Sequence, residues 1–109
     1  MKKVLFTFLA AMCCMSVFAE NFEFDGIMYN VTGDNTVEVV SKEQRYSGIV
    51  TIPSTVTHNS TTYNVTSIGI MAFDACSGLT SVNISSGVET IGYGAFNNCS
   101  SLTSVDIPN

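Results

Sequence analysis

The sequence predicts a solenoid in which short parallel strands alternate with short helical turns, preceded by an N-terminal antiparallel β-hairpin cap. Two observations predict it: a segment near the C-terminus is repeated directly after itself, and the segment upstream is a series of short strand-like runs joined by turn residues. The composition agrees. Charged residues make up 12% of the 109 residues, and the abundant Ser, Thr, Asn and Gly suit short strands and turns.

Residues 1–19 have the layout of a secretory signal peptide. Lys2 and Lys3 form a basic start, residues 4–17 are almost all apolar or small, and Ala19 ends a cleavage-like triplet. The apolar run is shorter than the about 20 residues that a membrane helix needs. We therefore expect cleavage after Ala19 and secretion or surface display, with no transmembrane span afterwards.

Two other interpretations of this segment stay open. A transmembrane anchor is the weaker one because of the length of the apolar run. Lipid attachment at Cys13 or Cys14 is the other, although Met12 stands where a small residue is expected before a lipidated Cys13.

The charge of the chain excludes whole classes of partner. After cleavage only Lys42 and Arg45 remain against nine acidic residues, which gives a net charge of −7. Nucleic acids and anionic membrane surfaces are bound through clusters of Lys and Arg. We therefore expect no nucleic-acid partner.

Residues 20–46 are predicted to form the cap, a β-meander. Asp25-Gly26 is a strong signal for a two-residue hairpin turn, and residues 32–35 form a second turn between strand-like runs. A solenoid needs such a cap over its first coil. The charged stretch at residues 42–45 is expected to be a solvated loop.

Residues 47–64 are predicted to be a first half-coil with an inserted β-hairpin. The run at residues 50–53 repeats the pattern of residues 82–85, but the spacing to the next repeat is longer. Asn59-Ser60 divides two arms rich in Thr, Tyr and Val, which indicates a hairpin.

Residues 65–109 contain two leucine-rich repeats of equal length. Twelve of the 22 aligned pairs between residues 65–86 and 88–109 are identical, and most are apolar or small. We expect like residues to stack in successive coils: Phe73 on Phe96, Val82 on Val105, Leu79 on Leu102.

Each repeat has two parts. Ile91, Ala95, Phe96 and Cys99 recur at helical spacing and predict a short helical turn. The alternation that ends at Ile107 predicts a short strand. One helical turn and one strand in each repeat correspond to a leucine-rich-repeat-like coil.

The repeat resembles the BspA-type leucine-rich repeat, also described as the Treponema-pallidum-type repeat. The residues that carry the resemblance are Ile91-Gly92, Ala95-Phe96, Cys99, Leu102-Thr103-Ser104-Val105 and Ile107-Pro108. The resemblance implies a curved solenoid of parallel strands and export, often to the surface of Gram-negative anaerobes. Some family members are similar to adhesins, whereas many have no assigned activity.

The length departs from the family, whose members commonly have many repeats. The sequence stops at Asn109, just after a predicted strand, which is consistent with a minimal member, a truncated product or part of a longer protein. Oligomeric state and anchoring are left open.

The outward side chains of the predicted strands are the candidate binding surface. They alternate with apolar residues that point into the coil, and they are Thr51, Ser81, Asn83, Ser104 and Asp106. We expect this polar, mildly acidic strip to contact host or bacterial surface proteins or glycans, as an adhesin-like module. Solvation of the outer side of the sheet is the plain alternative. The competing function is structural: a cap and first coils that start a longer solenoid.

No constellation in the sequence points to an enzyme or to a cofactor. Cys76 and Cys99 occupy one repeat position, close enough for a disulfide, although two buried thiols are the favoured interpretation. Their spacing matches no recognised zinc motif, so no metal is expected. His58 lacks a nucleophile motif beside it, and we expect no catalytic residue.

Overall fold

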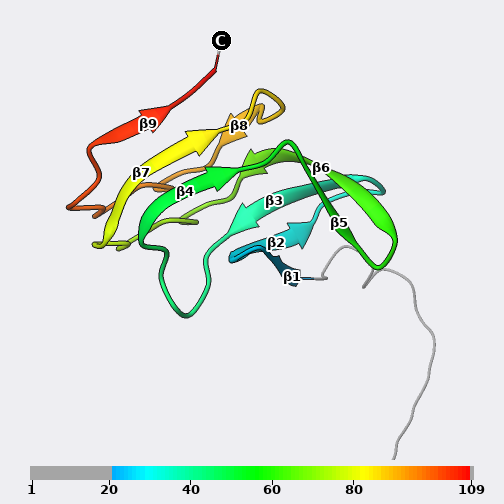
Figure 1. Ribbon diagram of the computed structural model, residues 1–109, viewed down its shortest axis with the longest axis horizontal. Coiled ribbons are helices and arrows are strands. Elements are labelled where there is room, and N and C mark those ends of the chain that lie inside the picture. Colours follow the sequence, from blue (N-terminus) through cyan, green and yellow to red (C-terminus); the bar gives the residue numbers. More distant parts are fainter. Residues whose placement is uncertain (1–20, 109) are drawn as a thin grey trace, which may run out of the picture.

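The computed structural model describes residues 21–108, and within this range the chain forms nine strands in two sheets (Figure 1). The strands are β1 (Asn21–Phe24), β2 (Ile27–Val31), β3 (Thr36–Val40), β4 (Gly48–Ile52), β5 (Thr55–His58), β6 (Thr61–Ile68), β7 (Leu79–Ile84), β8 (Thr90–Ile91) and β9 (Ser104–Asp106). The predicted signal peptide lies outside the described residues. No helix long and apolar enough to cross a membrane is found within residues 21–108.

One sheet, sheet A, contains the cap. Its strand order is β1-β2-β3-β6-β5, and β8 also pairs with β6. The pairs β1–β2 and β2–β3 are antiparallel, with the first turn at Asp25-Gly26, so the cap is present. The sheet curls so that its two outer strands meet. The ring of Phe22 in β1 stacks on that of His58 in β5, with 4.1 Å between ring centroids.

The second sheet, sheet B, is wholly parallel and has the order β4-β7-β9 (Figure 1). Val50 pairs with Val82, and Val82 pairs with Val105. These residues are spaced unequally along the chain. The extra residues between the first two form β5, the turn at Asn59-Ser60 and the start of β6, whereas the end of β6 pairs with β3.

Each coil contributes one strand to each sheet. In sheet A, β3, β6 and β8 are parallel neighbours, and in sheet B they are matched by β4, β7 and β9. The first coil is therefore β3 with β4, and it belongs as much to the cap as to the solenoid. The stack in sheet A was not predicted from the sequence.

The predicted helical turns are wrong, because residues 69–78 and 92–103 form successive β-turns. The N–H groups of Ala72, Asp74 and Cys76 donate to the carbonyl three residues earlier within the coil. The N–H groups of the alternate residues Met71, Phe73 and Ala75 donate instead to carbonyls of the next coil. The bond from Phe73 to Ala95, for example, is 2.8 Å long. A helix would need every N–H for its own i−4 carbonyl.

Backbone angles explain why the chain takes this form. Met71 and Ala75 have positive φ values of 59°, and at the equivalent positions of the next repeat Gly94 and Asn98 have φ values of 67° and 60°. An α-helix requires φ near −63° at each residue. A left-handed residue at the same place in each repeat therefore prevents a helix.

The core lies between the two sheets and along the turns. Phe73 is fully buried and stacks on Phe96, with 5.3 Å between ring centroids, as the repeat predicts. Tyr46 packs against the other side of Phe73 at 4.8 Å and starts this aromatic column in the first coil. Leu79 is buried in the same cluster, and the partly buried Leu102 packs against this cluster.

The repeated glycine of the Ile-Gly pair is required by close contact between coils. A Cβ atom on Gly92 would lie 2.7 Å from the backbone nitrogen of Ile70, and one on Gly69 would lie 2.9 Å from the carbonyl oxygen of Val39. Both distances are shorter than side chains tolerate. The glycines let the coils approach and form the short bonds from Gly69 to Val39 and from Gly92 to Ile68, both 2.7 Å.

Candidate functional site

The five predicted binding residues lie on the outward side of sheet B. Their inward neighbours, such as Val50 and Val82, are buried, so alternation along each strand turns the five residues away from the core. The register places them in two rows across the strands: Ile49, Ser81 and Ser104 in one, and Thr51, Asn83 and Asp106 in the other.

Hydrogen bonds between coils link members of each row. Asn83 donates from Nδ2 to Thr51 Oγ1 at 3.3 Å, and Ser104 donates from Oγ to Ser81 Oγ at 3.2 Å. Thr51, Ser104 and Asp106 are exposed, while Ser81 and Asn83 are half-buried. The side chains thus form a short, ordered polar surface that ends in one carboxylate.

Sequence reasoning missed Ile49. Its side chain is 71% exposed and opens the row that continues as Ser81 and Ser104. The alternation of Val50 and Ile52 as inward residues already turns Ile49 outward, and that signal could have found it. The surface therefore has an apolar side chain at its capped end.

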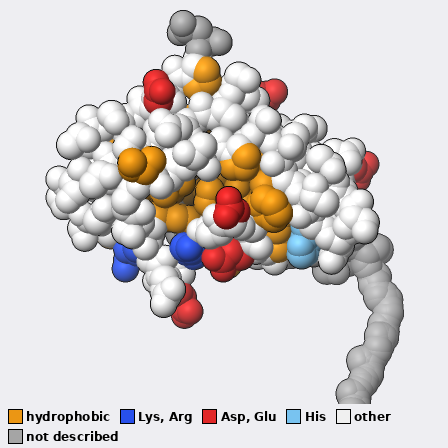
Figure 2. All heavy atoms as spheres, viewed as in Figure 1, with side chains coloured by type: hydrophobic (Ala, Val, Ile, Leu, Met, Phe, Trp, Pro, Cys, Tyr) orange, Lys and Arg blue, Asp and Glu red, His pale blue; other side chains and the backbone are white. Residues whose placement is uncertain are grey.

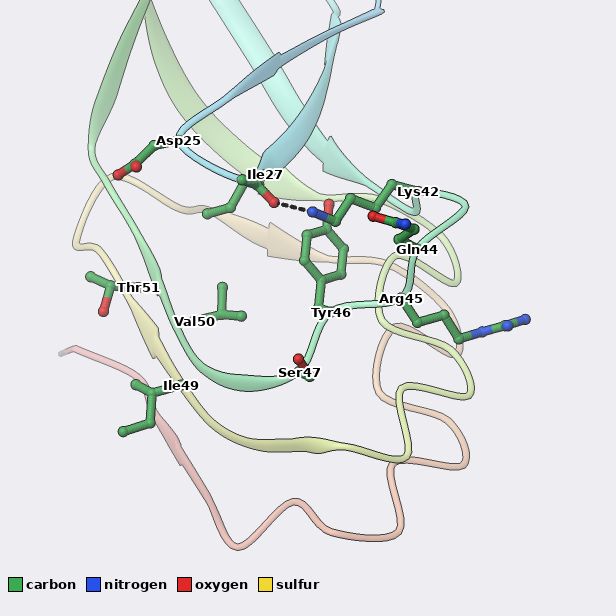
Figure 3. Close-up of a pocket in the computed structure, with 11 residues that line it drawn as sticks. Asp25, Ile27, Lys42, Gln44, Arg45, Tyr46, Ser47, Ile49, Val50 and Thr51 are labelled. Atoms are coloured by element: carbon green, nitrogen blue, oxygen red, sulfur yellow. Dashed lines mark hydrogen bonds between the residues drawn. The ribbon is translucent and has the colours of Figure 1, made fainter.

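A pocket of about 510 Å³ borders the surface at this end (Figure 3). Asp25 and Ile27 of the cap turn lie on one side of it, and Val50 and Thr51 of β4 lie on the other. The loop before β4, residues 42–47, forms the third wall. Sequence analysis did not predict this pocket, because the cap turn and β4 are distant in the chain.

Lys42 and Arg45 are the only Lys and Arg among residues 21–108, and both line the pocket. Figure 2 shows cationic side chains at the lower edge of this face, next to an area where hydrophobic side chains reach the surface. The side chain of Arg45 runs along the rim and away from the centre (Figure 3), and its Nε donates to the carbonyl of Asp74 at 3.4 Å.

Lys42 ties the cap turn to the loop. Its Nζ donates to the carbonyl of Gly26 at 2.5 Å, lies 3.6 Å from a Glu23 carboxylate oxygen, and sits 4.9 Å from the centre of the Tyr46 ring. The expected solvated loop is thus correct for Glu43, which is exposed, but not for the half-buried Lys42.

Tyr46 anchors the same loop from below. Its hydroxyl accepts a hydrogen bond from the N–H of Met28 at 3.0 Å and donates one to the carbonyl of Val40 at 2.7 Å. Burial raises the pKa of Tyr46 to about 12, and the bond from Met28 opposes part of this rise. The neutral hydroxyl is therefore a fixed part of the pocket floor.

Cys76 and Cys99 are both free thiols in the structure. Cys76 is buried, and Cys99 is half-buried and donates from Sγ to the carbonyl of Phe73 at 3.0 Å. Burial raises the pKa of both thiols. Neither is an activated nucleophile.

No group of three or more His, Cys, Asp or Glu side chains within residues 21–108 could hold a metal ion. His58 lies in the β5–β6 hairpin, stacked on Phe22 and 3.2 Å from the Asn59 amide. The expectations of no catalytic residue and no cofactor stay predictions.

The model of a family described as the BspA type leucine-rich repeat region (6 copies) matches residues 49–109. The chain belongs to this family. The match includes sheet B from Ile49 onward, the β-turn segments and all five predicted binding residues. A search of curated proteins finds no match.

Solved structures of other leucine-rich-repeat proteins are similar to this BspA-type chain. A leucine-rich repeat protein from Bacteroides ovatus is 43% identical, with a TM-score of 0.74 over 80% of this chain. A leucine-rich cell surface protein from Faecalibacterium prausnitzii is 34% identical, with a TM-score of 0.70 over 83% of this chain. The T. pallidum leucine-rich repeat protein, 23% identical with a TM-score of 0.65 over 82% of this chain and 40% of its own, shares the fold.

The chain spans only 23% and 24% of the lengths of the first two of these proteins.

Proposed function

We propose that this chain is an exported leucine-rich-repeat module whose outward face of sheet B binds proteins or glycans at a cell surface, as an adhesin-like contact. The observation that carries the proposal is the ordered double row on sheet B. Thr51, Asn83 and Asp106 offer hydroxyl, amide and carboxylate groups, and the parallel row begins with the exposed Ile49.

The chemistry of this surface supports contacts with polar partners. Its side chains are short and already held by bonds between coils, so little conformational entropy is lost on binding. Hydroxyl and amide groups donate and accept hydrogen bonds, which suits both glycan hydroxyls and exposed peptide groups. The exposed Ile49 adds an apolar contact at one end.

Family membership and the cell-surface protein among the similar structures also support a role in binding. No contact within residues 21–108 specifically favours the alternative, a chain that only starts a longer solenoid.

The direct experiment is binding of residues 20–109 to immobilised fibronectin and to immobilised mucin glycans. We expect saturable binding to one of them. The double variant Asn83→Lys and Asp106→Lys places two cations on the face and should abolish it. The matched control is Asp34→Lys with Asn35→Lys, which makes the same charge change at exposed positions in the β2–β3 turn.

Equal loss of binding in both double variants would assign the effect to net charge and overturn the role of this face. Export is tested separately by producing the full chain in a Gram-negative host. An N-terminus at Glu20 in the exported product is the expected result. A chain that stays in the cytoplasm with residues 1–19 attached would contradict it.

A further inference from the structure

The cap covers only one of the two sheets. In sheet A, β2 and β1 continue beyond β3, and the outer strands β1 and β5 cover each other through Phe22 and His58. In sheet B, β4 is an outer strand, and no strand of the cap pairs with it. Among the described residues, β4 therefore has an unpaired edge at the capped end of the solenoid.

The hydrogen-bonding groups on this edge follow from the register. In a parallel pair, alternate residues direct both N–H and C=O toward the same neighbour. The N–H of Gly48 donates to the carbonyl of Gly78 at 2.9 Å, which is toward β7. The N–H and C=O groups of Ile49 and Thr51 therefore point away from β7, and no residue from 21 to 108 bonds to them across the pocket.

The pocket provides space along this edge. Its lining includes Ile49 and Thr51, and the cap turn at Asp25 faces them from the other side (Figure 3). A volume of about 510 Å³ is within the usual range of small-ligand sites. It has room for an extended segment of a few residues.

The charge of the pocket indicates the kind of segment. The lining contains two cations, Lys42 and Arg45, on the loop that leads into β4, and one carboxylate, Asp25, while the chain as a whole has a net charge of −5. An acidic segment is repelled by the negative charge of most of this surface and would be attracted by the cations at this end.

We propose that the open edge of β4 binds an extended acidic peptide of a partner protein as an added strand. The backbone groups of Ile49 and Thr51 supply the main-chain hydrogen bonds, as in other cases of strand addition. A carboxylate at the end of the peptide beside the start of β4 contacts Lys42, and Arg45 at the rim adds a longer-range attraction. This site uses a strand edge, so it is separate from the outward side chains of the proposed binding face.

The test uses an array of synthetic nonapeptides with alternating Val and Thr, into which one or two Glu residues are placed at each position in turn. A matched array carries Lys in place of Glu. We expect saturable binding of Glu peptides and much weaker binding of Lys peptides. No binding to either array, or equal binding to both, overturns the proposal.

Two variants locate the bound peptide. Thr51→Pro removes an N–H that β7 does not use, and it should weaken binding about tenfold or more. Thr51→Ala keeps the N–H and should bind as the native chain does.

Amide hydrogen exchange gives a measurement that does not depend on folding of the variants. Addition of the best Glu peptide should slow exchange at Ile49 and Thr51 and leave unchanged that of Val105, whose N–H lies on the outer edge of β9 by the same register. Protection on β9 instead would overturn the assignment to β4. A dimer that forms without peptide and is lost in Thr51→Pro would assign the edge to a second copy, and that also overturns the proposal.

The two proposals can fail independently. The Asn83→Lys and Asp106→Lys double variant alters the binding face but leaves the open edge of β4, so it should still bind the Glu peptide. Loss of peptide binding in that variant would place the peptide on the face and contradict a separate site.

Discussion

The rings of Phe73 and Phe96 lie parallel, with 2° between their planes and 5.3 Å between their centroids. They are the same residue of successive repeats, and Tyr46 continues the column on the capped side. The coils are thus held together by like side chains in contact, and the burial of each ring depends on its neighbours.

Truncation within this column should have unequal effects. Phe73→Ala removes a fully buried ring between two others, and we expect a loss of about 3–5 kcal/mol in the free energy of unfolding. Phe96→Ala removes a half-buried ring with one ring neighbour, and about 1–2 kcal/mol is expected. Urea unfolding of both variants measures the difference, and equal losses would contradict the column.

The glycine contact between coils predicts a second stability effect. Gly92→Ala puts a Cβ atom against the backbone of Gly69 and Ile70, and we expect a loss of about 1–3 kcal/mol from overpacking. The control is Gly87→Ala, whose Cβ would meet only the Val65 carbonyl oxygen at 3.5 Å. It should change stability by less than about 0.5 kcal/mol. Thermal unfolding of the two variants compares them.

Two buried tyrosines should respond oppositely to removal of the hydroxyl. Tyr46→Phe leaves the N–H of Met28 and the carbonyl of Val40 without their partner, and should destabilise the fold by about 1–3 kcal/mol. The Tyr29 hydroxyl is buried and has no hydrogen-bond partner among the described residues. Tyr29→Phe should therefore be neutral or stabilising in the same urea titration. A larger loss for Tyr29→Phe than for Tyr46→Phe would contradict this assignment.

The same tyrosines predict how stability depends on high pH. Burial raises the pKa of Tyr46 from 10.0 in the unfolded chain to about 12, and raises that of Tyr29 as well. A group whose pKa is higher in the folded state favours folding while it is protonated. This contribution is complete below pH 10 and is lost as the pH rises through the folded-state value. Unfolding midpoints measured from about pH 9 to 12 should fall, and less steeply in Tyr46→Phe.

The thiols predict a chemical observation. Cys99 should react with a thiol reagent before Cys76, because it is half-buried and Cys76 is buried. Both should react more slowly than a free cysteine, since burial raises each pKa and lowers the thiolate fraction. Mass spectrometry after alkylation in denaturant should show two labels on residues 20–109. A product without labels would indicate a disulfide instead.

Sequence alone predicts the contacts that the repeat specifies. The pairing of Val82 with Val105 and the stacking of Phe73 on Phe96 follow from one offset, since equal residues in equal coils occupy equal places. The hairpin turn at Asp25-Gly26 follows from local turn chemistry.

The helical interpretation was wrong for a physical reason. The spacing of Ala95, Phe96 and Cys99 brings three side chains inward in a row of β-turns as well as in a helix, so apolar periodicity cannot separate the two. The left-handed residues decide it, and Met71 and Ala75 are not residue types that announce a positive φ.

The binding surface was predicted in part. Alternation along the strands turns Asn83 and Asp106 outward, but the pocket depends on the approach of Asp25 to Thr51, which no local pattern encodes. The parallel pairing of Val37 with Val65 is likewise a distant contact that needed the structure.

The β5–β6 hairpin shows where this architecture accepts a change of length. Partners in β4 and β7 are 32 residues apart, while partners in β7 and β9 are 23 apart, and yet the valines of all three strands match across the sheet. The nine extra residues project as a hairpin at the corner after β4 and leave the pairing of these valines, which form one rung of the sheet, undisturbed. Corners of this kind are therefore where a loop or a small domain could be grafted without shifting any rung.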